Sequence, residues 1–232
     1  MTTQASQQNP HAATAAAYDR LSRWYDLLAG SEQPLVHLGV ESLAVQPGES
    51  ILEIGPGTGH ALLALVRAAG PAGRVTGVDL SPGMLRRAKR RLERAGLGRQ
   101  VRLIRADAAH LPLPPSSFDA AFLSFTLELF DESDVPLVLG ECRRVLRSTG
   151  RICVVSLSDE GGRRLMLRLY RWAHARFPAW VDCRPIAPSA LLEGSGFRVQ
   201  EILWRSLWGL AVQIVRAAPT PGPVAASRNS VA

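Results

Sequence analysis

Lysine and cysteine are both scarce in this chain of 232 residues. Lys89 is the one lysine among 27 basic residues, so the formal net charge of +7 reflects an arginine bias and does not by itself indicate a nucleic-acid-binding protein. The three cysteines, Cys142, Cys153 and Cys183, are odd in number and widely spaced. Without a C-x-x-C motif or a partnering histidine pair, they argue against a disulfide framework and against a metal site, and we expect them to be reduced.

Long apolar runs are absent as well. None reaches the roughly 18 residues of a membrane-spanning helix, and the first residues lack the basic and apolar pattern of a secretory signal. We therefore expect a soluble, cytoplasmic protein. Apolar residues make up 47% of the sequence and charged residues 20%, which provides one substantial core and argues against wholesale disorder.

Apolar runs that favour β-strands alternate with helical patterns between residues 51 and 157. Such alternation is typical of a parallel sheet with helices on both faces. The chain then ends in a short helix and two runs, FRVQEILW and LWGLAVQIVR, whose connection is short enough to make them antiparallel. The sequence therefore predicts an α/β fold with a seven-stranded, mostly parallel sheet and an antiparallel C-terminal hairpin.

Both ends of the chain have the composition of unstructured tails, over residues 1–14 and 217–232. We expect a single domain over residues 15–216. Two helical segments interrupt the strand pattern, at about 15–45 and 158–185, and are expected to act as lids.

A glycine-rich loop, EIGPGTG, joins the first strand to its helix and contains Glu53, Gly55, Pro56, Gly57 and Gly59. Glycines at such a junction let a ligand approach the backbone N–H groups at a helix N-terminus, although an ordinary tight turn has the same composition. Asp79, at the end of the next strand, lies where a carboxylate binds a ribose diol. Together these features indicate a nucleoside site.

The form of the loop favours S-adenosylmethionine over a dinucleotide. It reads G-x-G-x-G instead of G-x-G-x-x-G, and Glu53 would repel a pyrophosphate but attract an ammonium group. At the end of the third strand, Asp107 can accept a hydrogen bond from the adenine amine while the N–H of Ala108 donates to a ring nitrogen. The alternative is that Asp79 and Asp107 only cap helices or turns.

The stretches ILEIGPGTGH, VTGVDLSPGMLRRAKRR, IRADAAHLPLPPSSFDAAFLSF and LLEGSGF resemble those of class I S-adenosylmethionine-dependent methyltransferases, over about residues 15–216. This resemblance implies a Rossmann-like fold. DAAHLPLPPSSFD and the early Tyr-Asp pairs are similar to ubiquinone/menaquinone-biosynthesis C-methyltransferases and bacterial phospholipid N-methyltransferases. One stretch departs from the quinone enzymes, which usually have an Asn-containing segment where this chain has SFTLELFDESD.

The resemblance also implies a role for each residue of the cofactor site. The three loop glycines would line the methionine and the ribose, and Asp79 would bind both ribose hydroxyls. Further contacts would come from Leu80 and Met84 on the two sides of the adenine, Asp107 and Ala108 at its edge, Ser124 and Phe125 beside the sulfonium, and Tyr18 and Tyr25 in the N-terminal lid. Met84 is equally well explained as a core residue of the second helix.

Methyl transfer depends mainly on orientation and the exclusion of water, with a general base where the acceptor must lose a proton. The candidate bases are Glu128, His110, Tyr25 and His174. Desolvation in an apolar run would raise the pKa of Glu128, whereas a histidine in a proline-rich loop such as His110 is more typical of the surface. The sequence does not choose between them.

Two basic segments bear on the partner. In residues 163–177, Arg164, Arg168 and Arg171 fall on one side of a helix and Trp172 on another, which suits an anionic membrane surface or a solvated cap. The basic run over 86–94 is expected to be a solvated helix face. No basic patch with interleaved aromatic residues indicates nucleic acid.

We expect a methyltransferase for a small hydrophobic or lipid-like acceptor, with a quinol ring carbon favoured over a phospholipid amine. The alternatives from other classes are an NAD(P)-dependent oxidoreductase and a catalytically silent nucleoside-binding protein.

Overall fold

The computed structural model describes residues 30–161 and 184–221. Several expectations concern residues outside these ranges: the tail at 1–14, Tyr18, Tyr25, the basic helix at 163–177, His174 and Cys183. The described chain forms one seven-stranded sheet in the order β3-β2-β1-β4-β5-β7-β6, which confirms the predicted strand number. Its strands are β1 (Ser50–Ile54), β2 (Arg74–Asp79), β3 (Val101–Arg105), β4 (Phe118–Ser124), β5 (Leu146–Leu157), β6 (Phe197–Leu207) and β7 (Leu210–Pro219).

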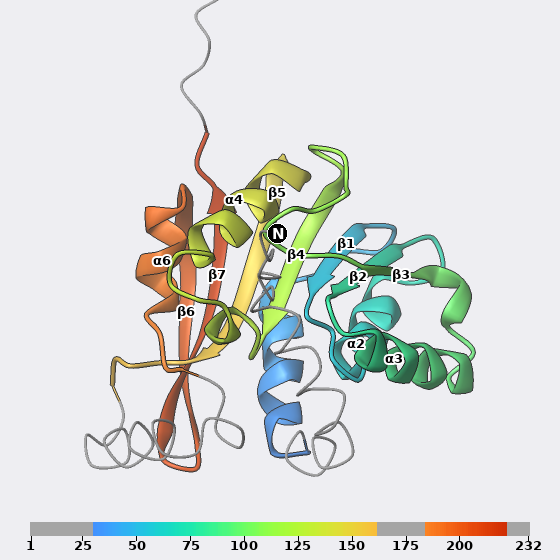
Figure 1. Cartoon of the computed structure of the whole chain (residues 1–232), viewed down its shortest axis with the longest axis horizontal. Coiled ribbons are helices and arrows are strands. Elements are labelled where there is room, and N and C mark those ends of the chain that lie inside the picture. Colours follow the sequence, from blue (N-terminus) through green and yellow to red (C-terminus); the bar gives the residue numbers. More distant parts are fainter. Residues whose placement is uncertain (1–29, 162–183, 222–232) are drawn as a thin grey trace, which may run out of the picture.

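The first five strands are parallel, and β7 pairs antiparallel with both β5 and β6. Figure 1 shows this hairpin, in orange and red, at one edge of the sheet and β3 at the other. Two boundaries differ from those predicted. Strand β7 continues to Pro219, beyond the expected start of the tail at residue 217, because β6 pairs with it as far as Phe197. Strand β3 ends at Arg105, so Asp107 lies in the turn that follows.

Helices cover both faces of the sheet, as the alternating pattern predicted. A helix over residues 30–43 packs with α2 (His60–Ala69) and α3 (Pro82–Arg94) on one face, around Phe122 and Val155. On the other face, α4 (Val135–Val145) and α6 (Pro188–Gly194) enclose a second cluster around Leu139 and Val154. Two short 3₁₀ turns, η1 (Gly98–Gln100) and η2 (Leu127–Leu129), complete the described elements. Among the described helices, none has both the length and the apolar character needed to cross a bilayer.

The helix α3 illustrates how the sequence specifies its own boundaries and exposed face. Ser81 is its N-cap, and the Ser81 side chain accepts a hydrogen bond from the N–H of Met84 at 3.2 Å. Pro82 occupies the first turn, where the backbone N–H that proline lacks would have no partner within the helix. Its buried residues are Met84, Ala88 and Leu92. Because Lys89 and most of the neighbouring arginines point outward, the basic run is a largely solvated face, as expected.

Candidate functional site

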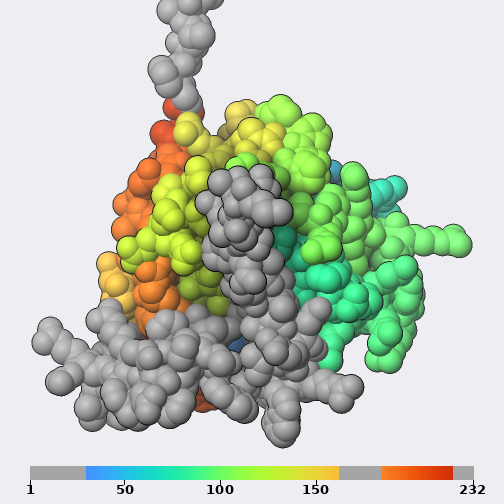
Figure 2. Space-filling view, viewed as in Figure 1, coloured from blue at the N-terminus to red at the C-terminus, as the bar shows by residue number. Residues whose placement is uncertain are grey.

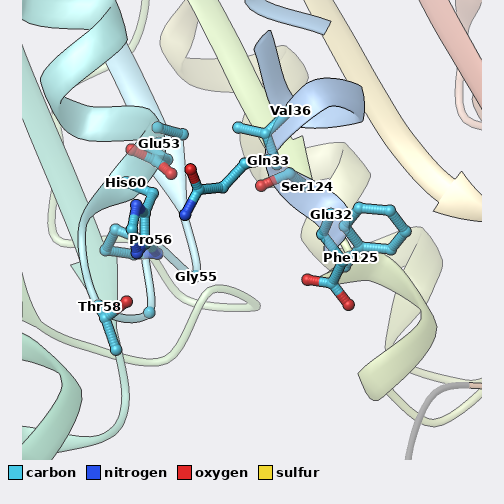
Figure 3. A pocket seen from close by; sticks show the side chains of 12 residues that line it. Glu32, Gln33, Val36, Glu53, Gly55, Pro56, Thr58, His60, Ser124 and Phe125 are labelled. Carbon is cyan, nitrogen blue, oxygen red and sulfur yellow. The ribbon is translucent and has the colours of Figure 1, made fainter. Parts of the chain in front are cut away.

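The strand order reverses between β1 and β4, and ligands of open α/β sheets bind at such a point, beyond the carboxyl ends of the strands. A pocket lies there. The loop after β1 forms one wall, the residues after β4 form a second, and the start of the helix over 30–43 forms a third. The lining residues are Glu32, Gln33, Val36, Glu53, Gly55, Pro56, Gly57, Thr58, His60, Ala61, Ser124 and Phe125 (Figure 3).

The glycine loop owes its shape to three residues with positive φ: Gly55 at 65°, Gly57 at 52° and Gly59 at 85°. A Cβ on Gly55 would also overlap the side chain of Thr126, so this position requires glycine for its conformation and for its packing. Gly55 and Gly57 line the cavity, and their contacts with a cofactor stay a prediction. Gly59 does not line it, because its Cα faces α3, where a Cβ would lie 3.0 Å from Ala88.

Glu53 is a buried carboxyl group in the cavity wall. Its side chain is 1% exposed, and its Oε2 has no hydrogen-bond partner within the described part of the chain. Burial raises the pKa of Glu53 well above its ordinary value, and the charge of Asp79 raises it further. An unpartnered buried carboxyl at the wall of a cavity is a site for a cationic ligand group.

Asp79 holds the loop and the next helix together. Its Oδ2 accepts a hydrogen bond from the N–H of Gly57 at 3.3 Å, and its Oδ1 accepts one from the N–H of Ser81 at 2.8 Å. These contacts correspond to the turn-capping alternative. They also fix the carboxylate beside the glycine loop, but Asp79 does not line the cavity, so its contact with a ribose stays a prediction.

The residues expected around the adenine do not line the cavity. Asp107 accepts hydrogen bonds within its own turn, from the N–H of Ala109 at 2.9 Å and at 3.4 Å from the ring of His110. Ala108 and Met84 are buried in the interior, and the carbonyl of Leu80 accepts from Arg105. For these four residues the structure describes capping and packing, and their adenine contacts stay a prediction.

Six lining residues were not predicted: Glu32, Gln33, Val36, Thr58, His60 and Ala61. Figure 3 shows the side chain of Gln33 projecting into the space between Glu53 and Ser124. The apolar spacing over 35–44 predicted a helix in this region and a lid function for it. The pattern contains no signal for which of its polar residues face a ligand, because that depends on how the helix is seated on the sheet.

The segment after β4 crosses the carboxyl ends of three strands. Phe125 has a positive φ of 48°, which is strained for a bulky side chain. Its N–H donates to the carbonyl of Val155 on β5 at 2.8 Å, while the hydroxyl of Thr126 donates to the carbonyl of Gly55 after β1 at 3.3 Å. These bonds hold Ser124 and Phe125 at the cavity, and their place beside a sulfonium stays a prediction.

The structure separates two of the candidate bases. The side chain of His110 is 78% exposed on the surface. Glu128 in η2 is 2% exposed, and burial raises its pKa to about 8. The expectation of a desolvated carboxyl at Glu128 is therefore confirmed, and His110 is the surface residue expected of its loop.

Comparisons with known proteins agree with this geometry. Residues 51–150 match a family model described as a methyltransferase domain. Over 158 residues, 67% of this chain and 69% of the relative, the sequence is 35% identical to a demethylmenaquinone methyltransferase of Thermus thermophilus. The chain belongs to the class I S-adenosylmethionine-dependent methyltransferases. It is also 31% identical over 149 residues to a ubiquinone/menaquinone biosynthesis C-methyltransferase of Hahella chejuensis, 59% of whose length is covered.

Solved structures share the fold at lower identity. Geranyl diphosphate methyltransferase in complex with S-adenosylmethionine has a TM-score of 0.65 at 16% identity, covering 82% of this chain and 86% of that one. The [4+2]-cyclase SpnF has a TM-score of 0.66 at 19% identity, covering 82% of each chain. A cyclase and a methyltransferase therefore share this fold, and the function has to be argued from the site.

The residues of this methyltransferase chain fit the cofactor of its family. The ammonium of S-adenosylmethionine would satisfy the unpartnered Oε2 of Glu53, and the cofactor has no phosphate that this carboxylate would repel. Gly55 and Gly57 leave the backbone open on the cavity side, and the carboxylate of Asp79 stands next to them. A carboxyl group at Glu53 disfavours a pyrophosphate, which argues against NAD(P), whereas Asp79 would suit the ribose of either cofactor.

Proposed function

We propose that this chain transfers a methyl group from S-adenosylmethionine to a ring carbon of a prenylated quinol. The observation that carries the proposal is the cavity at the strand reversal, where the buried carboxyl of Glu53 faces the same space as Ser124 and Phe125. The names of the two relatives described above support a quinol over a phospholipid amine, since both are quinone methyltransferases. The chain spans about 60% of the length of the first relatives it matches, 59% and 60% for two of them.

The residues of the chain would act by binding and orientation. When bound, the cofactor supplies an electrophilic methyl group on a sulfonium. Glu53 would hold its ammonium, and Asp79 its ribose, while Phe125, which is 3% exposed, would keep water away from the reacting atoms. Alignment of the acceptor carbon with the methyl group requires both partners to be held at once.

The test is methyl transfer to a chemically reduced, prenylated 1,4-naphthoquinol that lacks the ring methyl. We expect the labelled methyl of S-adenosylmethionine on the ring carbon of the product, identified by mass spectrometry and NMR. Asp79→Ala should lose this activity together with cofactor binding. Label in phosphatidylethanolamine instead of the quinol would contradict the proposed acceptor, and cofactor binding without any transfer would favour the silent binding protein.

We further propose that the protein works in the cytoplasm as a peripheral membrane protein, since a prenylated quinol resides in the bilayer. The basic segment 163–177 carries this proposal and lies outside the described residues. The full chain should co-sediment with anionic vesicles in a salt-sensitive manner. Changing Arg164, Arg168 and Arg171 together to Glu should abolish the effect, and equal sedimentation of this variant would contradict it.

A further inference from the structure

Glu128 lies in the segment that borders the cavity, three residues after Phe125. The bonds of Phe125 to β5 and of Thr126 to the loop after β1 fix this segment across the strand ends. Glu128 itself is anchored to β5, because its Oε1 accepts a hydrogen bond from the N–H of Leu157 at 3.2 Å. The carboxyl group is therefore held by β5 in the segment whose first residues, Ser124 and Phe125, line the cavity.

The two oxygens of this carboxyl group have different surroundings. Glu128 is 2% exposed, yet its Oε2 accepts no hydrogen bond within the described part of the chain. Leaving such an atom unpaired costs about 1–3 kcal/mol, which a purely structural carboxyl would avoid. The free oxygen is thus available to a ligand.

The cavity and Glu128 are linked through Glu32. Glu32 lines the cavity from the helix over 30–43, and its negative charge acts on Glu128. The carboxyl of Glu128 is therefore within electrostatic reach of the cavity wall, although Glu128 is not itself a lining residue. A neighbouring glutamate of the same segment, Glu132, behaves differently, since its side chain is 83% exposed and pairs with Arg184 at the surface.

We propose that Glu128 is the catalytic base of this chain, and that its free oxygen takes the hydroxyl proton of the methyl acceptor. This inference rests on the proposed methyltransferase function. It gives a role to the segment SFTLELFDESD, in which the chain departs from the quinone enzymes that it resembles. It also accounts for a buried carboxyl that cofactor binding does not use.

The proposed step balances for a quinol. The Glu128 carboxylate accepts the hydroxyl proton, the ring carbon forms a bond to the methyl group, and the methyl–sulfur bond breaks with its electron pair retained by sulfur. The sulfonium charge and the carboxylate charge are thereby both neutralised. The ring carbon then loses its proton to solvent, the carbonyl oxygen regains one from Glu128, and the quinol and the carboxylate are restored.

This role implies a particular dependence on pH. Burial is the main cause that raises the pKa of Glu128 to about 8, with a smaller contribution from the charge of Glu32. Hydrogen bonds from the backbone and from Ser156 on β5 lower the pKa of Glu128 and so oppose this rise. The nearby cation, the Arg184 guanidinium on the adjoining segment, is paired with Glu132. Because the base must be ionised, kcat should rise with pH through this value.

The experiment compares the wild-type chain with Glu128→Gln, Glu128→Asp and the surface control Glu132→Gln, using labelled S-adenosylmethionine and the reduced naphthoquinol. Glutamine can still accept the bond from Leu157 but takes no proton. We expect its kcat to fall about 100-fold or more, with unchanged KM for the quinol and unchanged binding of S-adenosylhomocysteine. Glu128→Asp should retain the rise of kcat with pH, Glu32→Gln should move it to lower pH, and Glu132→Gln should match wild type.

A lipid extract, offered as a second source of methyl acceptors, distinguishes failure of the role of Glu128 from failure of the proposed quinol function. If the wild type labels no quinol but labels another compound in a lipid extract, the quinol assignment is wrong, and the variants are compared on that compound. Equal kcat for Glu128→Gln and wild type on a methylated acceptor would overturn the role of Glu128 alone. Absence of transfer to any acceptor would overturn both.

Discussion

Two acidic residues show how far residue patterns predict a ligand site. Glu53 precedes a glycine loop and was predicted to suit an ammonium group; the structure places it in the cavity wall, and its ligand stays a prediction. Asp107 was predicted as an adenine contact, yet its carboxylate closes a local turn with Ala109 and His110. Aspartate is favoured both at turns and at ligand sites, so its identity alone does not separate the two.

The buried carboxyl of Glu53 predicts that cofactor affinity depends on pH. Its raised pKa keeps it protonated in the empty site, and an ammonium group favours its ionised form, so binding releases a proton. The affinity for S-adenosylhomocysteine should rise with pH, by up to about tenfold per unit. Calorimetry in buffers of different ionisation enthalpy measures both quantities.

A matched ligand and a matched variant complete this test. 5′-Methylthioadenosine has the nucleoside but no ammonium group, and its affinity should not change with pH. Glu53→Gln should remove the pH dependence for S-adenosylhomocysteine. Proton release that persists in this variant would assign the effect to another group.

At the scale of elements, the helix over 30–43 determines the cavity. It lies close to the sheet because Gly39 has no side chain where a Cβ would overlap Val155 and lie 3.1 Å from Phe122. Arg151 of β5 fixes its C-terminal end, donating to the carbonyls of Leu43 and Ala44. The sequence predicted the helix from its apolar spacing, but its docking depends on these long-range contacts, so Glu32 and Gln33 were missed.

Two of the helical glycines, Gly39 and Gly140, should respond oppositely to alanine. Gly39→Ala should lower the free energy of unfolding by about 1–3 kcal/mol, because the added carbon overlaps buried side chains, and should weaken cofactor binding. Gly140 of α4 is exposed, and an alanine Cβ there would meet no described atom within 4 Å. Gly140→Ala should therefore raise the free energy of unfolding by about 0.5–1 kcal/mol. Urea denaturation measures both, and equal effects would contradict the close seating of the helix.

For the whole molecule, the basic net charge and the acidic site have separate locations. Much of the positive charge lies on the exposed face of α3, whereas Glu32, Glu53 and Glu128 are grouped at the strand reversal. Figure 2 shows the two halves of the described surface, with the C-terminal elements in orange on one side and the first half of the chain in green on the other.

The sheet order and the hairpin were predictable from periodicity and connection lengths, since these are local features. The grouping of three carboxyl groups was not, because it depends on tertiary packing.

The buried carboxyls predict that the folded state loses stability as pH rises. The pKa of Glu128 is about 8 in the folded chain, against an ordinary value of 4.5. Between these values the folded chain retains a proton that the unfolded chain releases, so the free energy of unfolding falls by up to about 1.4 kcal/mol per pH unit. The stabilisation is complete below 4.5 and is lost as pH passes 8, and Glu53 acts in the same direction.

Urea denaturation across this range, compared between wild type and Glu128→Gln, measures the contribution of Glu128. The variant should show a shallower fall. The lowered pKa values of Glu49, Asp119 and Glu141 do not interfere, because those groups titrate below their ordinary values. Identical slopes for the two proteins would show that Glu128 is ionised in the folded state.

We expect the cavity between β1 and β4 to bind S-adenosylmethionine and not a dinucleotide. Calorimetric titration of the full chain with S-adenosylhomocysteine, and separately with NADH, tests it most directly. We predict one site for S-adenosylhomocysteine, weakened about 100-fold by Asp79→Ala through the loss of two charged hydrogen bonds, and no heat from NADH. Binding of NADH with none of S-adenosylhomocysteine would contradict the claim.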